Sequence, residues 1–99
     1  MYYLGLDLGS KTCGFAIADD KTKIATGLCN YEYQKNNLMS VVHKVSSVIK
    51  EYDNQINTIV IGYAINYKSN EPNESMQRVD KFVALLQQAL PTIKIIKQD

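Results

Sequence analysis

The hydrophobic pattern of this sequence changes its period near Asn37. Before that residue, short apolar runs occupy residues 2–8, 14–19 and 24–33, and tight polar turns separate them. Short apolar runs joined by polar turns are typical of neighbouring antiparallel strands. The first part of the chain therefore predicts a three-stranded meander.

After Asn37, apolar residues recur at the spacing of one helix face. This stripe consists of Leu38, Val41, Val42, Val45, Ile49 and Tyr52. Either Asn36 or Asn37 is expected to cap the helix, because asparagine is a favoured N-cap residue. His43 falls on the opposite, polar face, so we expect it to be solvated.

The rest of the chain predicts a strand, a helix and a final strand. Residues 58–65 are apolar on both faces, as in central parallel strands, and residues 93–96 form the last apolar run. Between them a second helical stripe consists of Met76, Val79, Val83, Leu86 and Leu90, and Pro91 stops it. The order β-β-β-α-β-α-β predicts one α/β domain over residues 1–99, a mixed sheet with helices packed against its faces.

Composition excludes some classes of function and leaves others open. The formal net charge is +1, so nucleic-acid binding would require a local basic patch. Because no apolar run approaches the ~20 residues that span a bilayer, we expect a cytoplasmic protein without membrane contact. Cys13 and Cys29 are expected to be reduced and to pack as small core residues.

One carboxylate, Asp7, stands near the end of the first apolar run, which we expect to be buried on both faces. A lone acid there would be costly to bury without a partner. Gly9 and Ser10 follow with backbone N–H groups that can approach a phosphate, and Lys11 can neutralise an anion. A hard oxygen ligand beside a phosphate-binding turn is the combination that holds Mg²⁺ against a substrate phosphate.

Four segments, in order along the whole chain, resemble one family. LGLDLGSKTCGFAIAD, IVIGYAIN, SNEPNESMQRVDKF and IKIIKQD are similar to segments of the bacterial Holliday-junction-resolvase-like proteins, also described as pre-16S rRNA nucleases. The first segment is the most specific of the four. The resemblance implies a ribonuclease-H-like fold and a Mg²⁺- or Mn²⁺-dependent endonuclease acting on structured nucleic acid, either branched DNA or precursor rRNA.

The resemblance also implies roles for particular residues. Asp7 matches the family's first metal-binding acid and Asp99 matches a later one, so both are candidate catalytic and metal-binding residues. Glu71 lies near another acidic position of the family. The residues implied to contact nucleic acid or phosphate are Gly9, Ser10, Lys11, Thr12, Asn66 and Arg78.

The sequence departs from the family pattern after its last strand. A glutamate and a final acid on a C-terminal helix follow the position of Asp99 in the family, and this chain has neither. We therefore expect 1–99 to be a piece of a longer protein, with weak metal binding and weak or absent cleavage.

Two other functions fit part of the same pattern. A nucleic-acid-binding module on a degenerate nuclease scaffold would use a patch such as Lys11, Lys68 and Arg78. The actin and sugar-kinase superfamily has a similar Asp-x-Gly-Thr turn, but its members bind nucleotide between two large lobes. Since 99 residues build at most one such lobe, this reading is the weaker one. A homodimer is expected if the substrate is a symmetric junction.

Overall fold

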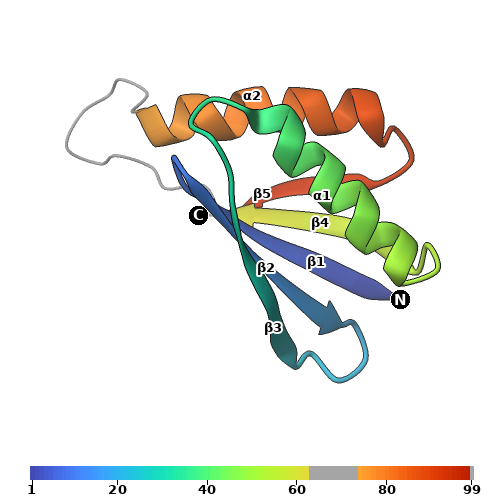
Figure 1. The fold of residues 1–99 in the computed structure, drawn as a ribbon. Helices are drawn as coiled ribbons and strands as arrows, with labels where there is room; N and C mark the ends of the chain where they lie inside the picture. Colours follow the sequence, from blue (N-terminus) through green and yellow to red (C-terminus); the bar gives the residue numbers. More distant parts are fainter. Residues whose placement is uncertain (63–73, 99) are drawn as a thin grey trace.

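The computed structural model describes residues 1–62 and 74–98, which form five strands and two helices in the predicted order (Figure 1). The elements are β1 (Tyr2–Leu8), β2 (Thr12–Asp19), β3 (Ala25–Glu32), α1 (Leu38–Glu51), β4 (Ile56–Gly62), α2 (Glu74–Ala89) and β5 (Lys94–Gln98).

The strands form one mixed sheet with the order β3-β2-β1-β4-β5. β1 pairs antiparallel with β2, and β2 pairs antiparallel with β3. β4 lies parallel to β1 on the other side, and β5 lies parallel to β4. The predicted meander and the α/β, ribonuclease-H-like mixed sheet are therefore confirmed.

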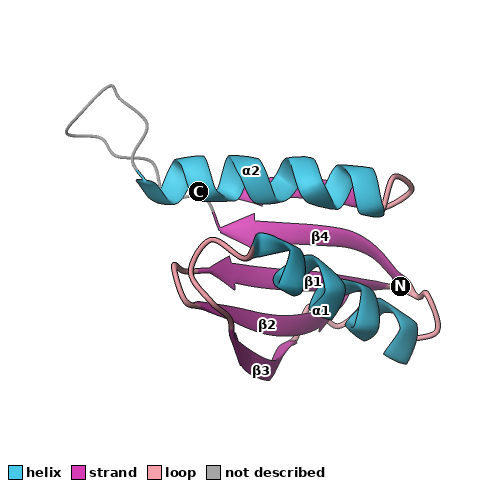
Figure 2. Cartoon of the chain, turned by 45° about the horizontal axis from the view of Figure 1, so that its top comes forward, coloured by secondary structure: helices cyan, strands magenta, loops and turns pink. Residues whose placement is uncertain are grey.

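Both helices cover the same face of the sheet (Figure 2). The connections from β3 to β4 through α1 and from β4 to β5 through α2 run in the same direction across the sheet. Crossovers between parallel strands are right-handed, so two crossovers in one direction place their helices on one side. The predicted packing of helices against the sheet is therefore confirmed, but in the described residues both helices lie on one face and the other face carries no helix.

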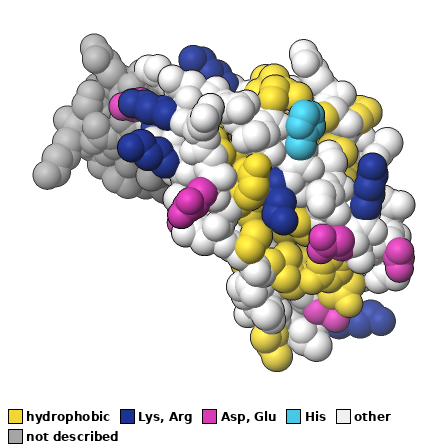
Figure 3. All heavy atoms as spheres, in the orientation of Figure 1, with side chains coloured by type: hydrophobic (Ala, Val, Ile, Leu, Met, Phe, Trp, Pro, Cys, Tyr) yellow, Lys and Arg dark blue, Asp and Glu magenta, His cyan; other side chains and the backbone are white. Residues whose placement is uncertain are grey.

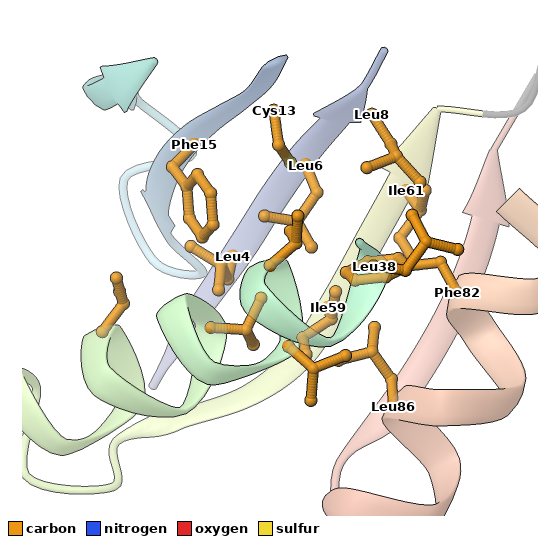
Figure 4. Close-up of a cluster of buried hydrophobic side chains, with 14 of the residues drawn as sticks. Leu4, Leu6, Leu8, Cys13, Phe15, Leu38, Ile59, Ile61, Phe82 and Leu86 are labelled. Atoms are coloured by element: carbon orange, nitrogen blue, oxygen red, sulfur yellow. The ribbon is translucent and has the colours of Figure 1, made fainter. Parts of the chain in front are cut away.

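The core lies between the two helices and the covered face of the sheet (Figure 4). The helices contribute side chains such as Val41, Phe82 and Leu86, which are fully buried. Strand residues such as Leu4 of β1 and Ile59 of β4 pack against these helix side chains from the sheet. Two amphipathic helices thus cover one apolar sheet face, which is a common layer architecture.

The first strand is buried on one face only, in contrast to our prediction. Leu4, Leu6 and Leu8 point into the core, whereas Tyr3 and Asp7 are exposed on the other face. The run therefore keeps the alternation of a half-buried strand, and Asp7 incurs no burial cost. β4 also carries less buried positions, since Val60 is only half-buried.

Three smaller predictions have mixed outcomes. His43 is exposed, as predicted. Asn37 occupies the N-cap position of α1, but its side chain makes no capping hydrogen bond, and the Ser40 hydroxyl donates to the Asn37 carbonyl instead. Cys13 is buried as predicted, whereas Cys29 is exposed because it lies on the edge strand β3.

Replacing Phe82 with alanine should destabilise the fold by about 3–5 kcal/mol, because it leaves a cavity where α2 meets the sheet. Urea unfolding followed by circular dichroism measures the loss. The exposed Gln88→Ala on the same helix is the control and should change stability by less than about 0.5 kcal/mol. Equal effects of both changes would contradict the proposed core.

Stability should decrease as the pH rises above about 9. Burial raises the pKa of the Cys13 thiol from 9.0 to about 12, and the nearby Asp7 charge adds to the effect. Between these values the unfolded chain releases the Cys13 proton and the folded chain retains it, so alkali favours unfolding. Urea titrations between pH 8 and pH 11 should show this decrease in the parent and in Cys29→Ser. A decrease of the same size in Cys13→Ala would show that another group causes it.

Candidate functional site

Asp7 lies on the open face of the sheet, close to the carboxyl end of β1. It is the penultimate residue of that strand and is paired in register with Gly14 of β2. Its side chain is exposed, because the two helices cover the opposite face. Ligands of open α/β sheets commonly bind at the carboxyl ends of strands, so this position suits a metal-binding or substrate-binding acid.

A shallow depression surrounds Asp7 on this face. Small residues of β1, β2, β3 and β4 form half of its lining, and Gln98 of β5 also lines it. The lining residues are Gly5, Leu6, Asp7, Gly14, Phe15, Ala16, Cys29, Val60, Gly62 and Gln98. Among these, Asp7 supplies the one carboxylate. The depression therefore offers a single hard anionic ligand in a wide, accessible surface.

A tight turn follows Asp7 and joins β1 to β2. The Gly9 N–H donates to the Thr12 carbonyl at 2.7 Å and closes the turn. A Cβ at Gly9 would lie 3.2 Å from that carbonyl, so glycine allows the close approach. Since its N–H is already bonded, Gly9 shapes the turn, and Ser10 and Lys11 at its tip remain the candidates for phosphate contact. Lys11 is exposed.

Tyr33, which follows β3, fixes this turn from the covered side of the sheet. Its hydroxyl donates to the Gly9 carbonyl, and its backbone N–H donates to the Lys11 carbonyl at 2.9 Å. Burial raises the pKa of Tyr33, and the nearby Arg78 charge opposes the shift. Sequence reasoning missed this residue, and its one signal was an aromatic side chain at the end of an apolar run.

Arg78 belongs to the same end of the molecule. It lies near the start of α2, close enough to Tyr33 to act on its ionisation. Its side chain is only 17% exposed, and its Nη2 lies 3.7 Å from Oε1 of Glu74. The structure therefore places Arg78 near Tyr33 and the turn of residues 9–12, on the helix-covered side of the sheet, whereas Asp7 lies on the open face at the same end of the molecule.

The other candidates, Asn66, Glu71 and Asp99, lie outside the described residues, as does Lys68. Within residues 1–62 and 74–98, no three His, Cys, Asp or Glu side chains are grouped to hold a metal ion. Asp7 fits one ligand of a hydrated Mg²⁺ ion, because such an ion can bind through one or two carboxylates and complete its shell on substrate phosphates.

The sequence matches the family described as "RuvX: Holliday junction resolvase" over residues 1–99. The chain belongs to this family. A relative from Ureaplasma parvum, named "Putative pre-16S rRNA nuclease", is 40% identical over 102 residues, which cover 100% of this chain and 69% of the relative. A relative of the same name from Mycoplasmopsis pulmonis is 34% identical over 87 residues, which cover 87% of this chain and 58% of the relative.

Solved structures show how widely the fold of this RuvX family member is shared. RuvC from Thermus thermophilus superimposes with a TM-score of 0.64 at 12% identity, over 99% of this chain and 63% of RuvC. A protein from Cytophaga hutchinsonii described as a "putative sugar kinase" gives a TM-score of 0.60 at 13% identity, over 100% of this chain and 36% of that protein. The fold alone therefore does not distinguish the nuclease hypothesis from the sugar-kinase hypothesis. The family match favours the nuclease hypothesis.

In the described part of the chain, neither helix is long and apolar enough to cross a membrane.

Tyr33→Phe should loosen the turn that follows Asp7, because it removes the hydroxyl that bonds the Gly9 carbonyl. The expected loss is about 1 kcal/mol of unfolding free energy. Amide hydrogen exchange should show faster exchange at the Gly9 N–H, with core amides of β4 changed only by the overall loss of stability. The exposed Tyr3→Phe is the matched control. Unchanged exchange at Gly9 would contradict a clamping role for Tyr33.

Proposed function

We propose that this chain is the core of a metal-dependent endonuclease that acts on structured nucleic acid, either Holliday junction DNA or precursor 16S rRNA. The observation that carries the proposal is the exposed Asp7 at the carboxyl end of β1, beside the turn of residues 9–12, in a chain of the RuvX family. Such a role implies a cytoplasmic location.

Each candidate residue has a distinct part in this proposal. Asp7 anchors a divalent cation, Mg²⁺ or Mn²⁺, and Asp99 is the proposed second carboxylate. A bound divalent cation would stabilise negative charge on the scissile phosphate and favour ionisation of water. Lys11 neutralises the approaching nucleic-acid backbone, and Ser10 and Thr12 belong to the turn over which the phosphate lies.

Asn66 and Arg78 are the remaining proposed contacts with nucleic acid. Arg78 suits a phosphate because its planar guanidinium can donate two parallel hydrogen bonds to two oxygens. Its position near Tyr33 supports the assignment, since Tyr33 holds the turn next to Asp7.

The two substrate classes have separate support. The family description names the Holliday junction, and the relatives' name refers to precursor 16S rRNA. A four-way junction is two-fold symmetric, so symmetric cleavage would call for a homodimer. Precursor rRNA places no such demand. The oligomeric state on each nucleic acid therefore helps to distinguish the two.

A nucleic-acid-binding role without cleavage is the second candidate. It is favoured by the single carboxylate of the depression around Asp7, because the two-metal nucleases need several ligands. The chain of residues 1–99 should accordingly bind a divalent metal weakly and cleave slowly at best.

Asp7→Asn should abolish divalent-metal binding at the open face of the sheet. Mn²⁺ added to the parent protein should broaden the NMR signals of residues beside Asp7, and the variant should lose this effect. Any cleavage of a four-way DNA junction or of a precursor 16S rRNA 5′ segment should decrease at least about 100-fold in the variant, because the carboxylate ligand is lost.

The control is Asp53→Asn, which removes another exposed carboxylate, just after α1. It should leave the Mn²⁺ effect around Asp7 intact. If Asp7→Asn retained the local broadening, or cleaved as fast as the parent, Asp7 would not be the metal ligand. If the parent bound nucleic acid and Mn²⁺ without any cleavage, the binding role would replace the enzymatic one.

A further inference from the structure

A second concave surface lies on the helix-covered side of the sheet, away from the Asp7 depression. It lies between the loop that enters α1 and the first turns of α2. Its lining residues are Asn36, Leu38, Glu74, Gln77, Arg78 and Lys81. We call this surface the α1–α2 groove. Lys81 is exposed and Arg78 is half-buried, so both cations can reach a ligand in the groove.

The donors in this groove suit a phosphate group. Arg78 and Lys81 are three residues apart on one helix, which places their side chains on the same face. Asn36 and Gln77 add side-chain amides at the rim. Two cations of different geometry with amide donors nearby can hold a phosphate by charge-assisted hydrogen bonds.

A carboxylate also belongs to the groove. Oε1 of Glu74 lies 3.7 Å from Nη2 of Arg78, but the Glu74 side chain is 77% exposed. An ion pair this exposed contributes little to stability, so Glu74 can swing into solvent when a phosphate arrives. Glu74 therefore acts as a weak competitor for Arg78.

The groove lies at the same end of the molecule as Asp7. α2 begins there, next to the carboxyl end of β4, and Lys and Arg side chains stand at this end of the surface (Figures 1 and 3). Burial raises the pKa of the Tyr33 hydroxyl, and the positive charge of Arg78 lies near enough to oppose that rise. That hydroxyl donates a hydrogen bond to the carbonyl of Gly9, two residues after Asp7. One nucleic-acid strand that passes over the rim of the sheet can therefore contact both surfaces.

We propose that the α1–α2 groove binds a backbone phosphate of the nucleic acid, a different phosphate from the one held at Asp7. Arg78 and Lys81 supply the charge, and Asn36 and Gln77 orient the oxygens. The proposal rests on the proposed nuclease or nucleic-acid-binding function, and it extends the contact surface from one face of the sheet, over the rim, to the other. The contact is independent of base sequence, because the phosphate group is the same at every nucleotide.

The test compares two double variants that each remove two positive charges. Arg78→Ala/Lys81→Ala removes both positive charges of the groove. Lys21→Ala/Lys50→Ala removes two exposed cations from the opposite end of the molecule. Affinity for a four-way DNA junction and for a precursor 16S rRNA segment is measured by fluorescence anisotropy over a salt series without divalent metal. Omitting the metal keeps the result independent of Asp7.

The groove variant should weaken binding and make the slope of log affinity against log salt smaller by about 0.7 to 0.9, because it loses one phosphate contact. The opposite-end variant should keep the parent slope. Glu74→Gln should raise the affinity, because it removes the competing carboxylate, and Arg78→Lys should keep the slope while it lowers the affinity. Circular dichroism and urea unfolding verify that each variant is folded.

A parent-like slope in the folded groove variant would overturn the proposal while leaving the nuclease function standing. An equal decrease in both double variants would also overturn it, since binding would then follow net charge alone. If the parent protein bound neither nucleic acid, the proposed function itself would fail and the groove proposal with it.

Discussion

The packing of α1 and α2 against one face of the sheet determines the rest of this structure. Leu4, Ile59, Phe82 and Leu86 meet in a continuous apolar layer, and burial of that layer is the main favourable contribution to folding. Because both crossovers are right-handed and run in the same direction, the layer has one side only. The opposite sheet face therefore stays exposed in the described residues, and a charged side chain such as Asp7 can lie on it.

The carboxyl ends of the central strands meet the helix starts at one end of the molecule. There, Tyr33 connects the turn after β1 with the loop that enters α1, through bonds to Gly9 and Lys11. Arg78 approaches the same tyrosine from α2. Three segments distant in sequence are thus held together beside Asp7, although each contributes only one or two polar side chains. A site on such a scaffold depends on these few tertiary contacts for its geometry.

Periodicity predicted the elements well because hydrophobic spacing directly reflects which residues are buried. The stripe that begins at Leu38 and the one that contains Val79 and Leu86 both became helices, and each apolar run became a strand. Periodicity failed for the environment of β1, where Gly5 and Tyr3 resemble buried positions although their face is open. It failed in the same way for Cys29, because composition does not reveal which strand lies at an edge.

The sequence by itself determined the order of the elements, the core and membership of the RuvX family, and it selected Asp7 as the candidate acid. These depend on local spacing and on motifs, which are readable along the chain. Only the tertiary structure decided that Asp7 faces away from the helices, that Tyr33 holds the adjacent turn, and that Arg78 and Lys81 share a groove with Asn36. These relations join residues far apart in sequence, and they follow from the direction and handedness of the crossovers, which no local pattern encodes.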